Sequence, residues 1–155
     1  MADPLATVMA KLFTDLIGRS VSFSERMEPT PSPAEQAFAV YIVHPMGSVR
    51  VIRADTLLLA SFGGALMGLP SDTVKQRMAR SSVDASLYDA LLEVMNIASR
   101  VVSLEYRAVF RSIYPDTGSL PAEARETVRN PCYSNHFDVT VDGYDGGRLS
   151  LLAPI

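Results

Sequence analysis

The chain has 155 residues, of which 48% are hydrophobic and 20% are charged, and its formal net charge is −3. This composition is typical of one folded domain with a sizeable core, and it excludes an intrinsically disordered chain. The charged residues are dispersed, without the basic stripe that nucleic-acid binding requires or the polybasic cluster of a membrane anchor.

The start of the chain predicts a helix, a strand and a loop. Apolar residues recur at three- and four-residue steps from Leu5 to Ile17, Asp3 is placed to cap this helix, and Gly18 ends it. A short strand over Val21–Arg26 follows, with alternate apolar residues on one side. Three prolines within residues 28–35 then predict a loop.

A hairpin and two connecting helices are predicted next. β-Branched and aromatic residues predict paired strands over Phe38–His44 and Val49–Arg53. Asp55 is placed to cap a helix that runs to about Met67, where a glycine stops it. A short polar helix is expected from Ser71 to about Arg80.

The second half of the chain repeats the order of the first. A long helix over roughly Val83–Glu105 is followed by three strand candidates, at residues 108–114, 136–141 and 148–152. Residues 115–135, which hold Asp116, Gly118, Pro121 and Pro131, are expected to form a loop-like insertion. The glycine-rich run Asp142–Gly147 predicts the turn of the last hairpin. Each half therefore predicts one helix and three strands. These strands can pair into one mostly antiparallel sheet with the long helices packed against it, an α+β fold.

The long helix carries a narrow polar band opposite its apolar stripe. The members of this band are Ser86, Asp89, Glu93, Asn96 and Arg100. Glu93 and Asn96 are three residues apart, so their side chains are neighbours on the helix surface. Ala90 and Ile97 flank the band with an apolar border that a partner could cover. Taken alone, Glu-x-x-Asn is a weak signal, and an ordinary solvated helix face is the better explanation of it.

The surroundings of this pair carry a resemblance to a known family. A strand ends in Asp55, the next helix ends in Leu66-Met67-Gly68, and a polar linker leads to the long helix with Glu93-Val94-Met95-Asn96-Ile97. This arrangement, over residues 49–98, resembles the CheC/FliY/CheX family of chemotaxis phosphatases. The later segment Tyr114–Gly118 also resembles that family's passage from strand to loop.

The resemblance implies a single CheX-like domain over residues 1–155 that dephosphorylates a CheY-like receiver domain in chemotaxis or two-component signalling. By the same resemblance, Asn96 is the catalytic residue that positions the attacking water. Glu93 is implied to pair with a lysine of the receiver. The Mg²⁺ belongs to the phosphorylated receiver, so no cofactor or metal site of the chain's own is expected. The first helix has no Glu-x-x-Asn, so one site is expected, as in CheX, and a homodimer is the default expectation.

One departure from the family pattern leaves the function open. The family commonly has glycine four residues after the asparagine, where this chain has Arg100. Arg100 could obstruct a receiver, pair with Glu93, contact the phosphoryl group, or point into water. Asp89, Ile97 and Arg100 are therefore candidates for partner docking. The alternative function is a catalytically silent binding module of the same fold in a motility or signalling assembly.

Other chemically interesting residues are better explained as structural. His44 lies at a predicted hairpin edge, and Cys132 and His136 lack the second pair that a zinc site needs. The same two residues lack an orienting third group for nucleophilic catalysis. Gly63 and Gly64 match no phosphate-binding motif and indicate close helix packing instead.

The compartment is expected to be the cytoplasm. Residues 1–4 lack the positive charge that begins a signal peptide, and the apolar stretch Thr56–Leu69 is too short to span a bilayer. The single cysteine, Cys132, cannot form an intramolecular disulfide, which favours a reducing compartment. We therefore expect a soluble protein with neither nucleic acid nor membrane as a partner.

Overall fold

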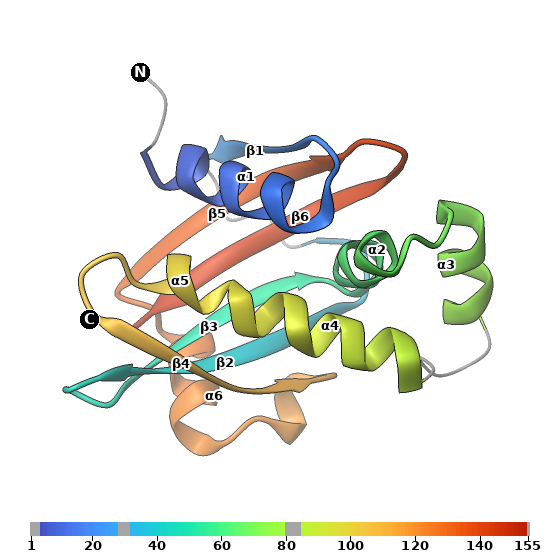
Figure 1. Cartoon of the computed structure of the whole chain (residues 1–155). Helices are drawn as coiled ribbons and strands as arrows, with labels where there is room; N and C mark the ends of the chain where they lie inside the picture. Colours follow the sequence, from blue (N-terminus) through green and yellow to red (C-terminus); the bar gives the residue numbers. More distant parts are fainter. Residues whose placement is uncertain (1–3, 28–31, 80–84, 155) are drawn as a thin grey trace.

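The computed structural model describes residues 4–27, 32–79 and 85–154 (Figure 1). The elements of the first half are α1 (Pro4–Ile17), β1 (Val21–Arg26), β2 (Gln36–His44), β3 (Ser48–Asp55), α2 (Thr56–Met67) and α3 (Ser71–Met78). Those of the second half are α4 (Ala85–Ile97), α5 (Ser99–Val102), β4 (Arg107–Tyr114), the 3₁₀ helix η1 (Thr117–Ser119), α6 (Ala122–Arg129), β5 (Tyr133–Val141) and β6 (Tyr144–Ala153). The predicted order of helix and three strands, twice, is confirmed. The proposed cap Asp3 lies outside the described residues.

Within the described residues, six strands form one antiparallel sheet in the order β1-β5-β6-β3-β2-β4. If β1, β2 and β3 are exchanged with β4, β5 and β6 respectively, the strand order is the same order read in reverse. The two halves are therefore interlocked, because each contributes a hairpin to the centre and a single strand to the edge beside the other hairpin. The predicted α+β fold with one antiparallel sheet is confirmed.

Helices cover both faces of this sheet. The main core lies between the sheet and the layer of α1, α2, α4 and α5, which stands in front of the strands in Figure 1. Phe13 from α1 stacks on Phe62 from α2 at the centre of that core, with ring centroids 4.6 Å apart. The opposite face carries a smaller core under α6, in which Thr127 donates to the carbonyl oxygen of Val49 at 2.9 Å.

The long predicted helix is shorter than expected. α4 ends at Ile97, Ala98 interrupts the regular helix, and α5 ends at Val102, so the predicted end at Glu105 is wrong. One contact and one backbone conformation accompany the early end. Arg50 on β3 donates to the carbonyl oxygen of Val102 at 2.7 Å. This carbonyl group, at the end of the helix, has no hydrogen-bond donor within the helix, so Arg50 supplies one. Beyond the helix, Ser103 is extended. The predicted start at Val83 lies outside the described residues.

The predicted loop-like insertion over residues 115–135 is also wrong, because it contains η1, α6 and the start of β5. The prolines that indicated a loop flank α6 and do not interrupt it: Pro121 immediately precedes its first residue and Pro131 follows its end. A proline at a helix boundary is compatible with the helix. α6 buries Ala124 and Thr127 against the sheet.

The turn of the last hairpin is shorter than predicted. Only Asp142 and Gly143 form it, and Gly146 and Gly147 belong to β6. These two glycines allow close packing. A Cβ atom at Gly146 would stand 2.3 Å from the carbonyl oxygen of Val139, and one at Gly147 would stand 2.9 Å from Oδ2 of Asp55.

Asp55 occupies the predicted N-cap position of α2, but its side chain makes no capping hydrogen bond. The carboxylate accepts instead from Ser32, Gln36 and the backbone N–H of Arg148. The predicted capping role is therefore wrong, because long-range donors surround the carboxylate. The N–H of Thr56, the first residue of α2, donates to the carbonyl oxygen of Glu35 at 2.8 Å.

Gly63 and Gly64 lie where α2 meets its neighbouring helices, which confirms the interpretation that they serve helix packing. A Cβ atom at Gly63 would stand 3.3 Å from the carbonyl oxygen of Leu87 and 3.3 Å from the backbone nitrogen of Leu91. One at Gly64 would stand 2.3 Å from a methyl group of Val74. The position of α4 therefore depends on the lack of a side chain at Gly63, and that of α3 on the lack of one at Gly64.

We expect Gly63→Val to lower the free energy of unfolding by about 1–3 kcal/mol, because the new side chain meets helix backbone, which cannot swing away. Met67→Val is the matched control, since it puts the same β-branched residue in the same helix at a position that is 38% exposed. Urea unfolding of the three proteins measures the difference. Equal stabilities of the two variants would contradict the proposed close contact.

Candidate functional site

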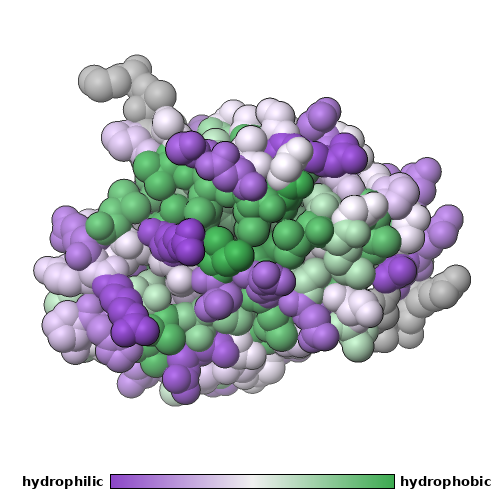
Figure 2. Space-filling model, viewed as in Figure 1, coloured by the Kyte–Doolittle hydropathy of each residue, from purple (hydrophilic) through white to green (hydrophobic). Residues whose placement is uncertain are grey.

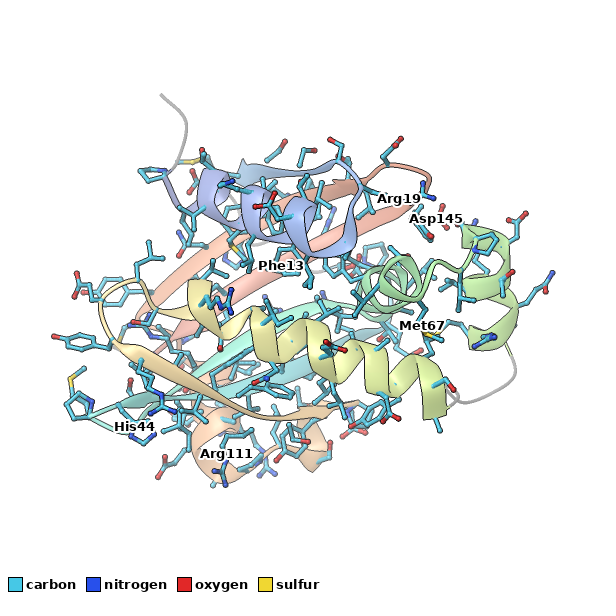
Figure 3. All side chains as sticks on the ribbon, in the orientation of Figure 1. Phe13, Arg19, His44, Met67, Arg111 and Asp145 are labelled. Atoms are coloured by element: carbon cyan, nitrogen blue, oxygen red, sulfur yellow. The ribbon has the colours of Figure 1, made fainter. Side chains whose placement is uncertain are left out.

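The predicted polar band lies on the outward face of α4 and α5. Glu93, Asn96, Asp89 and Arg100 are exposed, and Ile97 is partly buried beside them. The opposite side of α4 is buried in the core through residues such as Leu91, Val94 and Met95. In Figure 3, side chains project outward from the α4 ribbon, with Met67 of α2 next to that helix. The structure therefore brings the five predicted site residues onto one face.

The polar side chains of this face make few interactions with the rest of the described chain. Within the described residues, no side-chain hydrogen bond or ion pair engages Glu93, Asn96 or Arg100. The contemplated ion pair between Arg100 and Glu93 is not formed. Seven residues separate them, roughly 10 Å along a helix. The face thus presents a carboxylate, a carboxamide and a guanidinium that are all available to a partner.

Tyr41 holds the underside of this face in place. It lies at the centre of β2, fully buried, and its hydroxyl group donates to the carbonyl oxygen of Met95 at 2.7 Å. Burial raises the pKa of Tyr41 well above its ordinary value, so the hydroxyl keeps the proton that it donates. Sequence reasoning missed this residue. Its signal was a polar tip within an apolar strand, which requires a buried partner.

Tyr41→Phe should lower the free energy of unfolding by about 1 kcal/mol, because the carbonyl of Met95 loses its donor while the ring packing persists. The matched control is Tyr114→Phe, which removes a partly buried hydroxyl with no hydrogen-bond partner within the described residues. Thermal or urea unfolding compares the two variants. If both lose the same stability, the Tyr41 hydrogen bond does not anchor α4.

A cavity of about 470 Å³ opens beyond the end of α5. Its lining comes from the loop after α5 and from β3, β5 and β6, including Arg50, Glu105 and Tyr133. No residue of α4 lines it. Small molecules usually bind in concave sites, whereas Glu93 and Asn96 stand on the convex surface of a helix. The face is therefore better suited to a macromolecular partner.

The described part of the chain contains no cluster of three or more His, Cys, Asp or Glu side chains that could hold a metal ion. Cys132 is exposed, and His136 is engaged with the hydroxyl of Ser150 through Nδ1 at 2.7 Å. Burial, together with Arg53 and Arg26, lowers the pKa of His136. Helices in the described residues are all too short or too polar to cross a membrane.

Comparison with known proteins identifies the fold. No family model matches the chain, and no curated protein matches it in sequence. Solved structures do match over nearly its full length. A FliG–FliM complex from H. pylori gives a TM-score of 0.60 at 15% identity, covering 98% of this chain and 87% of the other. A CheX–CheY–BeF3–Mg complex from Borrelia burgdorferi gives 0.59 at 8% identity, covering 98% and 96%.

A third similar structure is FliY from Thermotoga maritima, with a TM-score of 0.55, 12% identity and coverage of 99% of this chain and 91% of the other. At such low sequence identities, the structural similarity establishes the fold alone. Any chemistry of this chain has to be inferred from the residues of the site. The structures that share this fold include CheX solved with CheY and FliM solved with FliG.

Proposed function

Because the chain has the CheC/FliY/CheX-like fold, we propose that it is a phosphatase that stimulates hydrolysis of the aspartyl phosphate on a CheY-like receiver domain. The observation that carries this proposal is the adjacent, exposed pair Glu93 and Asn96 on α4, whose side chains have no partner among the residues that the structure describes. A fold neighbour was solved as a CheX–CheY complex with BeF3 and magnesium, which supports a receiver as the partner. Receiver and phosphatase would meet in the cytoplasm.

Asn96 acts by positioning water. Its carboxamide is both a donor and an acceptor, so it orients a water molecule in line with the bond between phosphorus and the receiver's aspartate oxygen. The water oxygen attacks phosphorus, that bond breaks, and the products are inorganic phosphate and a free aspartate carboxylate. The Mg²⁺ held by the receiver stabilises the charge on the phosphoryl oxygens. Catalysis of this kind depends on placement more than on covalent chemistry.

Glu93 sets the register between the two proteins. Its carboxylate, three residues before Asn96, pairs with a cationic side chain of the receiver and holds Asn96 over the phosphoryl group. Asp89 lies one turn earlier on the same exposed face and adds to the negative charge. Ile97 supplies an apolar border to the contact.

A catalytically silent adaptor is the second candidate function, and Arg100 is the observation that favours it. Arg100 is exposed four residues after Asn96, on the side from which a receiver would approach. A large guanidinium there could displace the phosphoryl group from Asn96 while leaving partner binding intact. The similarity to FliM, solved in complex with FliG, also fits a role in an assembly.

The test is the decay of receiver domains loaded with acetyl phosphate and Mg²⁺, with and without this protein at substoichiometric concentration. The receivers are those encoded in the same genome. We expect at least one to lose its phosphoryl group faster, with multiple turnovers per molecule of this protein. Binding of a receiver without any acceleration of its decay would instead establish the adaptor function.

A further inference from the structure

α1 carries more apolar surface than the core uses. Its buried stripe consists of Ala6, Met9, Phe13 and Ile17. A second stripe, Val8, Leu12 and Leu16, lies beside it at four-residue steps, which places it on an adjacent side of the helix. Val8 is 38% exposed, and Leu12 and Leu16 are partly buried. Leu12 and Leu16 pack against the main core, so this second stripe is partly exposed, most of all at Val8.

The second stripe continues onto neighbouring helices. α1 contacts α2 and α5, and α2 ends in Leu66, which is partly buried, and Met67, which is 38% exposed. Ile97 lies at the junction of α4 and α5. Figure 2 shows the result as a broad hydrophobic area between α1 and α4, bordered by hydrophilic side chains. We call Val8, Leu12, Leu16, Leu66, Met67 and Ile97 the α1–α4 apolar surface.

This surface adjoins the proposed catalytic pair, and the cationic side chain of Arg100 lies at its border. Ile97 follows Asn96 directly, and Arg100 is exposed on α5, the helix that contacts α1. Glu93 and Arg100 stand roughly 10 Å apart along the helix. A partner that fits must therefore offer a cation opposite Glu93, an acidic or phosphoryl group opposite Arg100, and an apolar patch opposite α1.

We infer that the α1–α4 apolar surface, together with Arg100, is the second half of the docking site for the same receiver domain; this inference rests on the proposed function. The argument is one of area and charge. A specific interface buries about 800 Å² on each partner, which is more than the narrow polar band of one helix supplies. A receiver seated on Asn96 extends over the adjoining surface, and its anionic phosphorylated site is complementary to Arg100.

The occupant is a receiver and not a second copy of the chain, because a copy bound over Ile97 and α1 would cover Asn96. Large exposed apolar areas rimmed by polar side chains mark interaction sites in general. Here the rim contains the residues of the proposed chemistry. Receiver specificity therefore depends on α1, which is remote in sequence from Glu93 and Asn96.

Val8→Asp tests this inference. It places a charge in the apolar surface without touching the buried stripe or the catalytic pair. Met46→Asp is the matched control, because Met46 is 64% exposed at the β2–β3 turn, away from α1. We expect Val8→Asp to weaken binding of a beryllofluoride-loaded receiver about tenfold or more, while Met46→Asp binds like the wild type. At saturating phosphorylated receiver, kcat of Val8→Asp should stay within about twofold of wild type.

The outcomes separate this inference from the proposed function. Wild-type phosphatase activity with unchanged receiver binding by Val8→Asp overturns the docking surface and leaves the phosphatase intact. A wild type that binds a receiver without hydrolysis, together with weaker binding by Val8→Asp, overturns the phosphatase and supports the docking surface. The two proteins are also compared by sedimentation in the absence of a receiver. If the wild type is a dimer and Val8→Asp is a monomer, the surface belongs to a second copy of the chain and the inference is overturned. If Val8→Asp does not fold, Met67→Asp takes its place.

Discussion

Asn96→Ala is expected to lower the stimulated hydrolysis of a receiver's aspartyl phosphate about 10²-fold. The carboxamide is the group that orients water, and alanine offers neither a donor nor an acceptor in its place. Stability should change little, because Asn96 is exposed and engages no partner within the described residues. Receiver binding should also persist, since Glu93 remains. The measurements are single-turnover decay at saturating protein and, separately, the Kd for a beryllofluoride-loaded receiver.

Ser86→Ala is the control for this experiment. Ser86 is exposed two to three turns earlier on the same helix face, so its replacement removes a polar group from the band without touching Asn96. A 10²-fold loss in Asn96→Ala alone assigns the water-positioning role. Equal rates for both variants would contradict that role, even if the wild type were active. Loss of receiver binding together with rate would make Asn96 a docking residue.

The order of elements and the exposed face of α4 followed from the sequence because both depend on local periodicity. The spacing of Leu91, Val94 and Met95 identifies the buried side of the helix, and Glu93 and Asn96 then lie opposite. The alternation in β1 and the β-branched run of β2 likewise reflect burial on one or both faces of the sheet. These features need no knowledge of distant contacts.

The features that sequence reasoning missed depend on contacts between distant residues. The end of α5 is determined in part by Arg50, which lies on β3 and binds the carbonyl of Val102. Pro121 and Pro131 predict a loop where the structure has α6, because both prolines stand just outside the helix. The role of Gly147 is visible only once Asp55 is beside it. Proline and glycine mark local boundaries, but their meaning depends on what packs against them.

α1 shows the same limit at the functional surface. Its periodicity predicts one apolar face, whereas the structure divides that face into a buried stripe and a partly exposed one that includes Val8. Helical periodicity identifies which residues share a side. It cannot say how much of a wide apolar side a neighbouring element covers, since that depends on where α2 and α5 lie.

Replacing Asp55 by alanine is expected to lower the free energy of unfolding by about 2–4 kcal/mol. Asp55 is 7% exposed at the junction of β3 and α2. One carboxylate oxygen accepts from Ser32 Oγ at 2.7 Å and Gln36 Nε2 at 3.2 Å, and the other accepts from the Arg148 N–H at 2.9 Å. Alanine leaves these donors without their acceptor, and hydrogen bonds to a charged group are stronger than neutral ones.

The control is Asp116→Ala. Asp116 also accepts a backbone hydrogen bond, from Ser119 at 2.8 Å, but it is exposed, so water replaces the lost acceptor and the cost should stay below about 1 kcal/mol. Chemical unfolding of both variants gives the comparison. Because Asp55 joins β6 to the start of α2, and α2 positions α4, Asp55→Ala should also reduce phosphatase activity through a displaced Asn96. A variant as stable as Asp116→Ala would show that apolar packing around Leu58 and Phe62 holds this junction without the carboxylate.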